Sequence, residues 1–470
     1  MTAITVPISI TIKAGKREER IEKEIEIKDI ENMIDSLGQE VSGKILMTII
    51  NNLEDEIQQS VPRSWRNVGR EPRRAVFSHG HISYHRRVYR DEHGQRHKPL
   101  DELLGIQPYE RSSQKVQEMG SVLAAQTSYR MAANSLSYML KTAISPGSIQ
   151  CMMWRTGGRI ARQEEAWRST HAGTVAARVL YAESDGVWIH LQRERHKRQE
   201  ARVAVMYTGK KRVGKQRFRL ENKVVMTQLC GQTLDWQVKL RELADQSYDL
   251  EQTELMAVGG DGNSWVRQSF DLLNLPQARL LDRYHVMRAL RQSYSHTLNV
   301  SQLSRRLFNE GFEAVAQELT ACIRQARGKP KQRMQQTFNY LKNNQDALVD
   351  LDKRGLGHSH FQSLGSIEGN VDKLAVQRMK GRGCCWRLAG AEAMLAILRH
   401  KDELQRHGFV YQPVIQTVRE VIRVKSSQLQ QTYQPPGGGM PIFHDRDLNE
   451  PWVRMLKSKI DFGISLTGFF

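Results

Sequence analysis

The central third of the chain alternates hydrophobic and polar positions with the period of β-strands. LYAESDGVWIHLQ, ARVAVMYTG and NKVVMTQLC each show this period of two, and they follow one another along the chain. Their short connections predict an antiparallel meander of three strands. After them, DWQVKLRELADQSYDL predicts a helix, ELMAVGGDG a buried strand, SWVRQSFDLL a helix, ARLLDRY a strand and HVMRALRQSYSHTL a helix.

The resulting order, βββαβαβα, is that of the RNase H-like fold. We therefore expect an α/β protein with an RNase H-like core built on a mixed sheet. Residues 300–360 predict charged helices and no strand, and a further helix follows around SIEGNVDKLAVQRM.

The N-terminal part predicts a separate α+β region. TAITVPISITIKAG predicts a short strand, and the charged stretch after it predicts amphipathic helices of an arm or oligomerisation element. PRSWRNVGREPRR, residues 62–74, is broken by prolines and a glycine and predicts a basic linker. The next segment, up to residue 100, predicts a small β-meander with basic residues on one face.

Residues 109–158 predict a helix, a turn and a second helix. The helical period of the first part ends at ISPG, residues 144–147, and Ser148 is the expected N-cap of the second helix. In a basic protein such a unit would place Ser148, Gln150 and Arg155 in a DNA major groove. Ordinary helices of an α-helical domain explain the same spacing equally well.

The charge balance indicates a polyanionic partner. The chain has 70 Lys and Arg against 51 Asp and Glu, a formal net charge of +19, which points first to nucleic acid. No apolar run approaches the roughly 20 residues that cross a bilayer, and no signal peptide is evident, so we expect a cytoplasmic, nucleoid-associated protein without a membrane partner. The five cysteines form no CxxC pair, which predicts reduced structural thiols and no zinc site.

Three acidic residues stand where such a sheet would gather them. Asp185 shares one face of the first strand with Val187 and Ile189, Asp261 leaves the fourth strand amid three glycines, and Glu368 begins a later helix. Carboxylates that hold two divalent cations support phosphoryl transfer. Oxygen ligands suit Mg²⁺ or Mn²⁺, so we expect two such ions.

Each acid also has a purely structural explanation. Asp185 and Gly186 form the Asp-Gly pair of many hairpin turns, Asp261 would cap the next helix, and Glu368 would be a first-turn partner of the helix dipole. Asp372, one helical turn beyond Glu368, is a rival third acid. Taken together, the three acids in one predicted topology favour the metal site.

Four stretches, in this order, resemble bacterial insertion-sequence transposases of the ISLre type, relatives of the wider Mutator-like transposases. They are LYAESDGVWIHLQ, VGGDGNSW, LLDRYHVMRAL and SIEGNVDKLAVQRMKGRGCCW. The resemblance runs from about Val76 to about His400. It implies that Asp185, Asp261 and Glu368 form the family's DDE triad.

The same resemblance implies supporting residues around the triad. The family's Cys-or-Asp-x-x-His motif falls on Asp282 and His285, with His285 as an accessory catalytic residue. The tryptophan that Mutator-like enzymes place near the third acid matches Trp386, less closely. An all-α insertion is implied between the second and third acids.

Two basic clusters are predicted to contact DNA phosphates, which give affinity and little sequence information. The first lies on the connection between the second and third strands, and the second follows the third acid. The residues are Lys210, Lys211, Arg212, Lys215, Arg217 and Arg219 in the first cluster, and Lys373, Arg378, Lys380 and Arg382 in the second.

The expected division of the chain follows from these elements. It comprises an N-terminal arm (1–61), a basic linker with a β-meander (62–108), a helical DNA-binding domain (109–168), the first part of the core (169–298), an all-α insertion (299–362), the Glu-bearing helix of the core (363–410) and a C-terminal tail (411–470).

These features predict a DDE transposase that cleaves DNA at transposon ends and joins the freed 3′ hydroxyl to target DNA. Its partner would be double-stranded DNA, bound by a homo-oligomer. Two other functions remain open at this point. A nuclease or resolvase on the same fold would cut DNA without strand transfer, and a domesticated DNA-binding protein would have lost catalysis.

Overall fold

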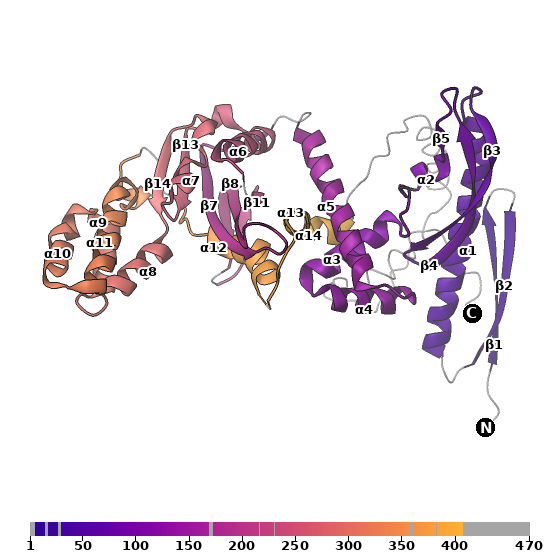
Figure 1. Cartoon of the computed structure of the whole chain (residues 1–470), viewed down its shortest axis with the longest axis horizontal. Coiled ribbons are helices and arrows are strands. Elements are labelled where there is room, and N and C mark those ends of the chain that lie inside the picture. Colours follow the sequence, from indigo (N-terminus) through magenta and orange to yellow (C-terminus); the bar gives the residue numbers. More distant parts are fainter. Residues whose placement is uncertain are drawn as a thin grey trace. The chain divides into compact units, whose positions relative to one another are not determined.

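The structure, a computed structural model, describes residues 5–14, 17–26, 30–168, 173–215, 217–229, 231–356, 361–381 and 383–407 (Figure 1). The chain forms two compact units. The first comprises residues up to Arg74 together with Ile82–Glu110, and the second comprises Ala75–His81 and the chain from Arg111 onward. The predicted C-terminal tail and Arg382 lie outside the described residues.

The first unit begins with a β-hairpin and a long helix. β1 (Thr5–Ala14) pairs antiparallel with β2 (Arg17–Glu26), and α1 (Ile30–Ser60) follows. The prediction of a helix over the segment of β2 is wrong. Ile21 and Ile25, four residues apart, satisfy both the helical and the strand period, and pairing with β1 selects the strand.

A three-stranded sheet in the order β3-β4-β5 comes next, with β3 at Arg66–Phe77, β4 at Gly80–Arg90 and β5 at Arg96–His97. It confirms the predicted β-meander. The linker predicted for residues 62–74 is wrong from the start of β3 onward. β3 is an edge strand, where the missing N–H of its proline disrupts no central pairing. The short helix α2 (Pro99–Leu103) follows the sheet.

Three helices open the larger unit: α3 (Gln114–Gln126), α4 (Tyr129–Leu140) and α5 (Pro146–Arg168). The single helix predicted before the ISPG turn is therefore wrong. Ser128 interrupts it, because its side chain accepts a hydrogen bond from the backbone N–H of Met131 and so caps α4.

The N-cap predicted at Ser148 is also wrong. α5 begins at Pro146, so Ser148 lies inside the first turn. The Oγ of Ser145 accepts the backbone N–H of Ser148 at 3.0 Å, which is the capping contact. Proline suits the first helical position because its missing N–H would have no partner there.

The centre of this unit is a five-stranded mixed sheet in the order β11-β8-β7-β13-β14 (Figure 1). β7 (Val179–His190), β8 (Arg198–Tyr207) and β11 (Val224–Leu229) form the predicted antiparallel meander. β13 (Leu255–Gly260) and β14 (Gln277–Leu281) run parallel to β7. All five strands lie where the sequence predicted strands, and the mixed α/β class is confirmed.

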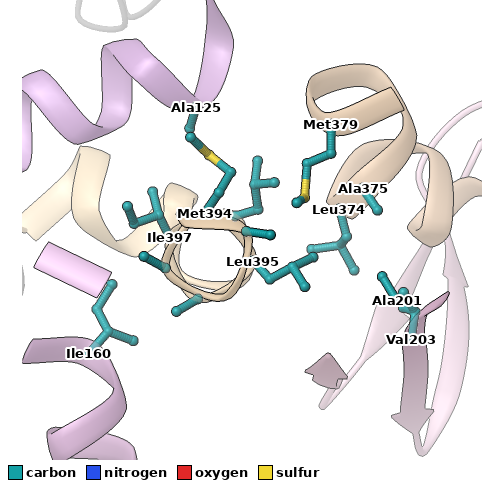
Figure 2. Packing of buried hydrophobic residues seen from close by; sticks show 14 of the residues in the cluster. Ala125, Ile160, Ala201, Val203, Leu374, Ala375, Met379, Met394, Leu395 and Ile397 are labelled. Carbon is teal, nitrogen blue, oxygen red and sulfur yellow. The ribbon is translucent and has the colours of Figure 1, made fainter. Parts of the chain in front are cut away.

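Helices cover both faces of the sheet. On one face, Trp236 and Leu240 of α6 (Thr233–Ser247) pack against the even-numbered residues of β7. On the other face, Leu395 of α13 (Leu388–Arg399) points towards Leu374, and Ala201 and Val203 of the sheet lie beside these two residues (Figure 2). On the opposite side of α13, Met394 and Ile397 point towards Ala125 and Ile160.

The helices around α13 complete this layer. α12 (Ile367–Val371) continues directly into a π-helical segment, Asp372–Lys380, so the helix predicted around SIEGNVDKLAVQRM is confirmed. Its Leu374, Ala375 and Met379 join the same core as the odd-numbered residues of β7.

A second helical core follows β14. α8 (Arg283–Tyr294), α9 (Val300–Glu310), α10 (Glu313–Gln325) and α11 (Gly328–Asn343) share one hydrophobic cluster. The described part of the predicted helical stretch is thus free of strands. The remaining elements are β6 (Val175–Ala176), β9 (Gly209–Arg212), β10 (Phe218–Glu221), β12 (Tyr248–Asp249), α7 (Ser264–Gln268), α14 (Lys401–His407) and 3-10 turns at Leu250–Gln252, Asp271–Leu273, Gln345–Ala347 and Leu351–Lys353.

Among the helices that the structure describes, none combines the length and the apolar character that a bilayer crossing requires.

Candidate active site

Asp185 lies in the middle of β7, opposite Val203 of β8. Its side chain is 8% exposed and shares the sheet face of Val187 and Ile189. The hairpin-turn explanation is therefore wrong, because the strand continues through both Asp185 and Gly186. The carboxylate accepts the backbone N–H of Gly186 at 2.7 Å. The carboxylate expected beside the aliphatic side chains of this face is present.

The strand register brings two more aspartates to the level of Asp185. Gly260 is the last residue of β13. On one side it lies opposite the residue of β7 that precedes Asp185, and on the other side it lies opposite the residue of β14 that precedes Asp282. Asp261 follows Gly260 directly. Because neighbouring strands are about 4.8 Å apart, the three aspartates stand side by side across the sheet.

Asp261 is held by its own turn and by a helix of the second core. Its carboxylate accepts the backbone N–H of Asn263 at 2.9 Å and the side-chain amide of the same residue. The hydroxyl of Tyr340 in α11 donates to the Asp261 carbonyl at 2.8 Å. The N-cap position of α7 is Asn263, so Asp261 does not cap that helix. Gly262 has φ +87, which favours glycine at this turn.

Asp282 and His285 form a hydrogen-bonded pair at the start of α8. The Asp282 carboxylate caps the helix by accepting the N–H of Tyr284 and also contacts Nδ1 of His285, each at 2.9 Å. This contact raises the pKa of His285, which burial alone would lower, and the charges of Asp185 and Asp261 raise it further. Burial raises the pKa of Asp282, but His285 and the hydrogen bond from the Tyr284 N–H together outweigh burial, so the pKa is lowered.

Glu368 is the third acid within electrostatic reach. Burial raises the pKa of Asp185 to about 6, and the negative charges of Asp261 and Glu368 add to the rise. The hydrogen bond from the Gly186 N–H and the charge of His285 act in the opposite direction and lower this pKa. Burial likewise raises the pKa of Asp261. The structure thus places Glu368 within electrostatic range of Asp185.

The rival third acid is engaged locally. The Asp372 carboxylate accepts the side-chain amide of Gln377 at 2.6 Å. Glu368, by contrast, is exposed in the first turn of α12. Of these two acids, Glu368 is the one that influences Asp185.

The donor set suits a hard divalent cation. Carboxylate oxygens are the ligands that Mg²⁺ and Mn²⁺ prefer, and a cation would offset both the burial of the Asp185 charge and its repulsion by Asp261 and Glu368. Within the described residues, no three His, Cys, Asp or Glu side chains converge closely enough to hold a metal ion as they lie. Binding an ion would therefore require side-chain adjustment.

Two acidic residues near the site were missed in the sequence. Glu183 lies two residues before Asp185, on the same face of β7, and is 1% exposed. Glu200 of β8 is half-buried; burial raises its pKa, and the charge of Asp261 raises it further. The period of two that singled out Asp185 also includes Glu183, so extending the alternation by one step would have found it.

The first basic cluster lies on the β9–β10 hairpin and divides into free and engaged residues. Arg212 donates to the carbonyls of Gly214 and Lys215 at 3.1 and 2.7 Å, so it stabilises the hairpin loop. Lys210 donates to the Ser363 carbonyl. The exposed residues of this cluster, whose side chains make no hydrogen bond or ion pair within the described chain, are Lys211, Lys215, Arg217 and Arg219.

The second basic cluster is divided in the same way. The Arg378 guanidinium lies 5.4 Å from the ring centre of Tyr129 and 4.8 Å from that of Trp386, and it donates to the Ala124 carbonyl. Arg378 therefore joins the helical layers rather than projecting from them. The buried Trp386 donates its Nε1–H to the Met379 carbonyl at 3.0 Å. Lys373 and Lys380 are exposed.

The three residues predicted to read DNA bases all lie on α5. Ser148 and Arg155, seven residues apart, share one side of the helix, whereas Gln150 is rotated by about 200° from Ser148. Ser148 also contacts the Oγ of Ser145 at 2.9 Å. α5 thus presents Ser148 and Arg155 together and Gln150 on another side.

One family of proteins matches most of the length of this chain. The chain belongs to the uncharacterised protein family UPF0236, whose model matches residues 20–409. A relative from Streptococcus gallolyticus, described as "UPF0236 protein in vanSb 3′region", is 26% identical over 384 residues, which cover 79% of this chain and 82% of the relative.

Among solved structures, a Drosophila P element transposase strand transfer complex is similar over 71% of this chain and 89% of its own. The sequence identity is 11% and the TM-score is 0.22. A likeness at this level carries no argument about activity.

Proposed function

We propose that this chain is a DDE transposase of the ISLre type, which cleaves DNA at transposon ends and transfers the freed strand to target DNA. We further propose that its mixed sheet is an RNase H-like core. The strand order β11-β8-β7-β13-β14, in which only β8 runs against the others, supports this fold assignment.

The observation that carries the proposal is the gathering of three acids from distant parts of the sequence. Asp185 and Asp261 lie at one level of two adjacent parallel strands, and Glu368 acts electrostatically on Asp185. A carboxylate whose pKa is raised by burial, and further by other carboxylates, is costly for the fold alone. Such a cluster is typical of a functional site.

The three acids would hold two Mg²⁺ or Mn²⁺ ions. When bound, such ions activate an attacking oxygen and stabilise a leaving oxygen in phosphodiester chemistry. Of the chain's own groups, the Asp282 carboxylate orients His285 through Nδ1, which leaves Nε2 of His285 for a phosphate oxygen. The raised pKa of His285 favours the protonated ring, which suits a phosphate contact.

Double-stranded DNA is the proposed partner, bound by a homo-oligomer. The exposed cations of the β9–β10 hairpin, together with Lys373 and Lys380, would contact phosphates. Ser148 and Arg155 share a side of α5 and would read bases in the major groove.

The test is a reaction of purified protein with a labelled duplex of the element's terminal inverted repeat, Mg²⁺ or Mn²⁺, and a supercoiled target. Wild type should give end-cleaved strands and joined products, and Asp185→Asn should give neither. Asp372→Asn is the matched control, because that acid is engaged by Gln377, and it should keep near-normal activity. Identical products from wild type and Asp185→Asn would contradict the catalytic assignment.

The same assay separates the two enzymatic alternatives. Cleaved strands without joined products, across several target DNAs, would favour a nuclease or resolvase on this fold. Specific end binding without cleavage in either metal would favour a DNA-binding protein that has lost catalysis.

A further inference from the structure

Glu183 is a buried carboxylate whose oxygens are occupied by donors from two separate parts of the chain. The hydroxyl of Tyr207 in β8 donates to Oε1 at 2.7 Å. The backbone N–H groups of Gly365, Ser366 and Ile367 donate to Oε2 at 2.7, 2.9 and 3.2 Å. A single side chain of the central strand thus holds three consecutive peptide groups.

The surroundings of Glu183 differ from those of Asp185, its neighbour on the same face. Asp185 accepts a hydrogen bond from Gly186, whereas Glu183 is 1% exposed and surrounded by donors. A buried carboxylate deprived of these donors would be strongly destabilised, so the arrangement is firmly maintained. Glu183 is therefore built to hold the chain and not to bind an ion.

The segment that Glu183 holds leads directly to Glu368. Further hydrogen bonds fix the same segment to the sheet: the Gln362 N–H donates to the hydroxyl of Tyr181 at 3.0 Å, and Lys210 donates to the Ser363 carbonyl. The rings of Tyr181 and Tyr207 stack with centres 5.3 Å apart.

The neighbouring strand leaves room for this arrangement. A Cβ on Gly259 of β13 would lie 3.1 Å from Cγ of Glu183 and 3.3 Å from the Leu364 side chain. Glycine at this position thus keeps the space into which the Glu183 side chain extends.

We infer that Glu183 is a positioning residue that fixes the Gly365–Ile367 backbone on the sheet and thereby sets the place of Glu368 relative to Asp185. The inference rests on the proposed function, because it assigns Glu183 a part in assembling that site. It predicts that Glu183, which lies two residues before Asp185, determines the position of Glu368.

The first arm of the test needs neither DNA nor metal. Glu183→Gln keeps the side-chain shape but removes the charge and replaces one accepting oxygen by an amide donor, so hydrogen exchange at Gly365–Ile367 should accelerate by about tenfold or more. Ser184→Ala is the matched control. Ser184 is equally buried in the same strand, and its Oγ contacts Ser269. Removing this hydroxyl should leave those amides protected.

The second arm measures metal-dependent end cleavage. Glu183→Gln should lower the single-turnover rate by about 10- to 100-fold and raise the Mg²⁺ concentration for half-maximal rate, with end-binding affinity unchanged. Glu183→Asp retains the charge and should recover part of the rate. It also serves in both arms if Glu183→Gln fails to fold. Ser184→Ala should cleave like wild type.

The outcomes of the two arms are distinguishable. Wild-type exchange protection and a wild-type rate in Glu183→Gln would overturn the inference, as would faster exchange with an unchanged rate and metal dependence. If wild type itself failed to cleave, the proposed function would fall and the catalytic part of the inference with it. The exchange arm would still decide whether Glu183 anchors the segment.

Discussion

Asp185 is the residue on which the proposed chemistry and the stability of the fold make opposite demands. Its carboxylate is buried beside aliphatic side chains and within electrostatic range of Asp261 and Glu368, which is unfavourable for folding. The alternation of β7 predicted the position of Asp185 correctly. It did not predict the role of Glu183, because the backbone groups that donate to Glu183 lie about 180 residues away in the sequence, where no local pattern indicates them.

Replacing Asp185 should stabilise the metal-free protein in a pH-dependent way. Its folded-state pKa of about 6 lies above the ordinary value of 3.8, so the folded state is penalised once the pH rises through this window. The penalty is about 3 kcal/mol at pH 8 and nearly absent below pH 4. Asp185→Asn should therefore raise the free energy of unfolding more at pH 8 than at pH 5.

Urea unfolding at the two pH values measures this effect, with Asp372→Asn as the control expected to show no such difference. Added Mg²⁺ should stabilise wild type and leave Asp185→Asn unchanged. An Asp185→Asn protein that is less stable than wild type at pH 8 without metal would contradict the account of the site.

At the scale of elements, local pattern succeeded where a segment lies in the central sheet and failed where two periods coincide. β7, β8 and β11 were predicted from their alternation and β13 as a buried strand, and an apolar β13 fits a sheet whose two faces are covered by helices. β2 was mistaken for a helix because Ile21 and Ile25 fit either period, and only pairing with β1 decides between them. β3 was mistaken for a linker because its segment is basic and contains a proline, and the sequence did not show that the strand lies at the edge of its sheet.

The packing of α5 against α13 depends on an ion pair that should be sensitive to acid. Glu164 of α5 accepts hydrogen bonds from Nε and Nη2 of Arg399, the shorter at 2.8 Å, and lies 2.8 Å from Nε2 of His400. Burial raises the pKa of Glu164, but Arg399 and His400 outweigh it and lower the pKa to about 2. The stabilisation is therefore present above the ordinary pKa of 4.5 and disappears as the pH falls towards 2.

Glu164→Gln should accordingly lower the free energy of unfolding by about 3 kcal/mol at pH 7, because it leaves Arg399 without its charged partner. The effect should shrink at pH 3. Thermal unfolding at both pH values checks this, with Glu165→Gln on the same helix as the control. Equal destabilisation at pH 7 and pH 3 would show that packing, and not the ion pair, is the cause.

At the scale of the whole molecule, the positive net charge is distributed between internal interactions and free surface. Some of the cations predicted to bind phosphates, such as Arg378 and Arg212, are engaged within the protein, whereas the hairpin presents exposed cations. Composition predicts an anionic partner for the chain as a whole. It does not separate these two groups of cations, because burial and pairing arise only in the folded chain.

Neutralising the hairpin should weaken DNA binding and reduce its dependence on salt. The triple variant Lys211→Ala, Arg217→Ala, Arg219→Ala should lower the slope of log K against log salt by about one for each phosphate that the hairpin no longer neutralises. Arg178→Ala is the control, since that exposed arginine is paired with Glu254. Fluorescence anisotropy over a salt series measures both. An unchanged slope in the triple variant would remove the hairpin from the DNA surface.

The central claim is that Asp185, Asp261 and Glu368 act as one site. Single-turnover cleavage of a transposon-end duplex by Asp185→Asn, Asp261→Asn and Glu368→Gln tests it most directly. Each variant should be slower than wild type by about a thousandfold or more, and the double variant of the two aspartates should be no slower than either alone. Near-normal cleavage by Glu368→Gln, with activity abolished in Asp372→Asn, would contradict the assignment.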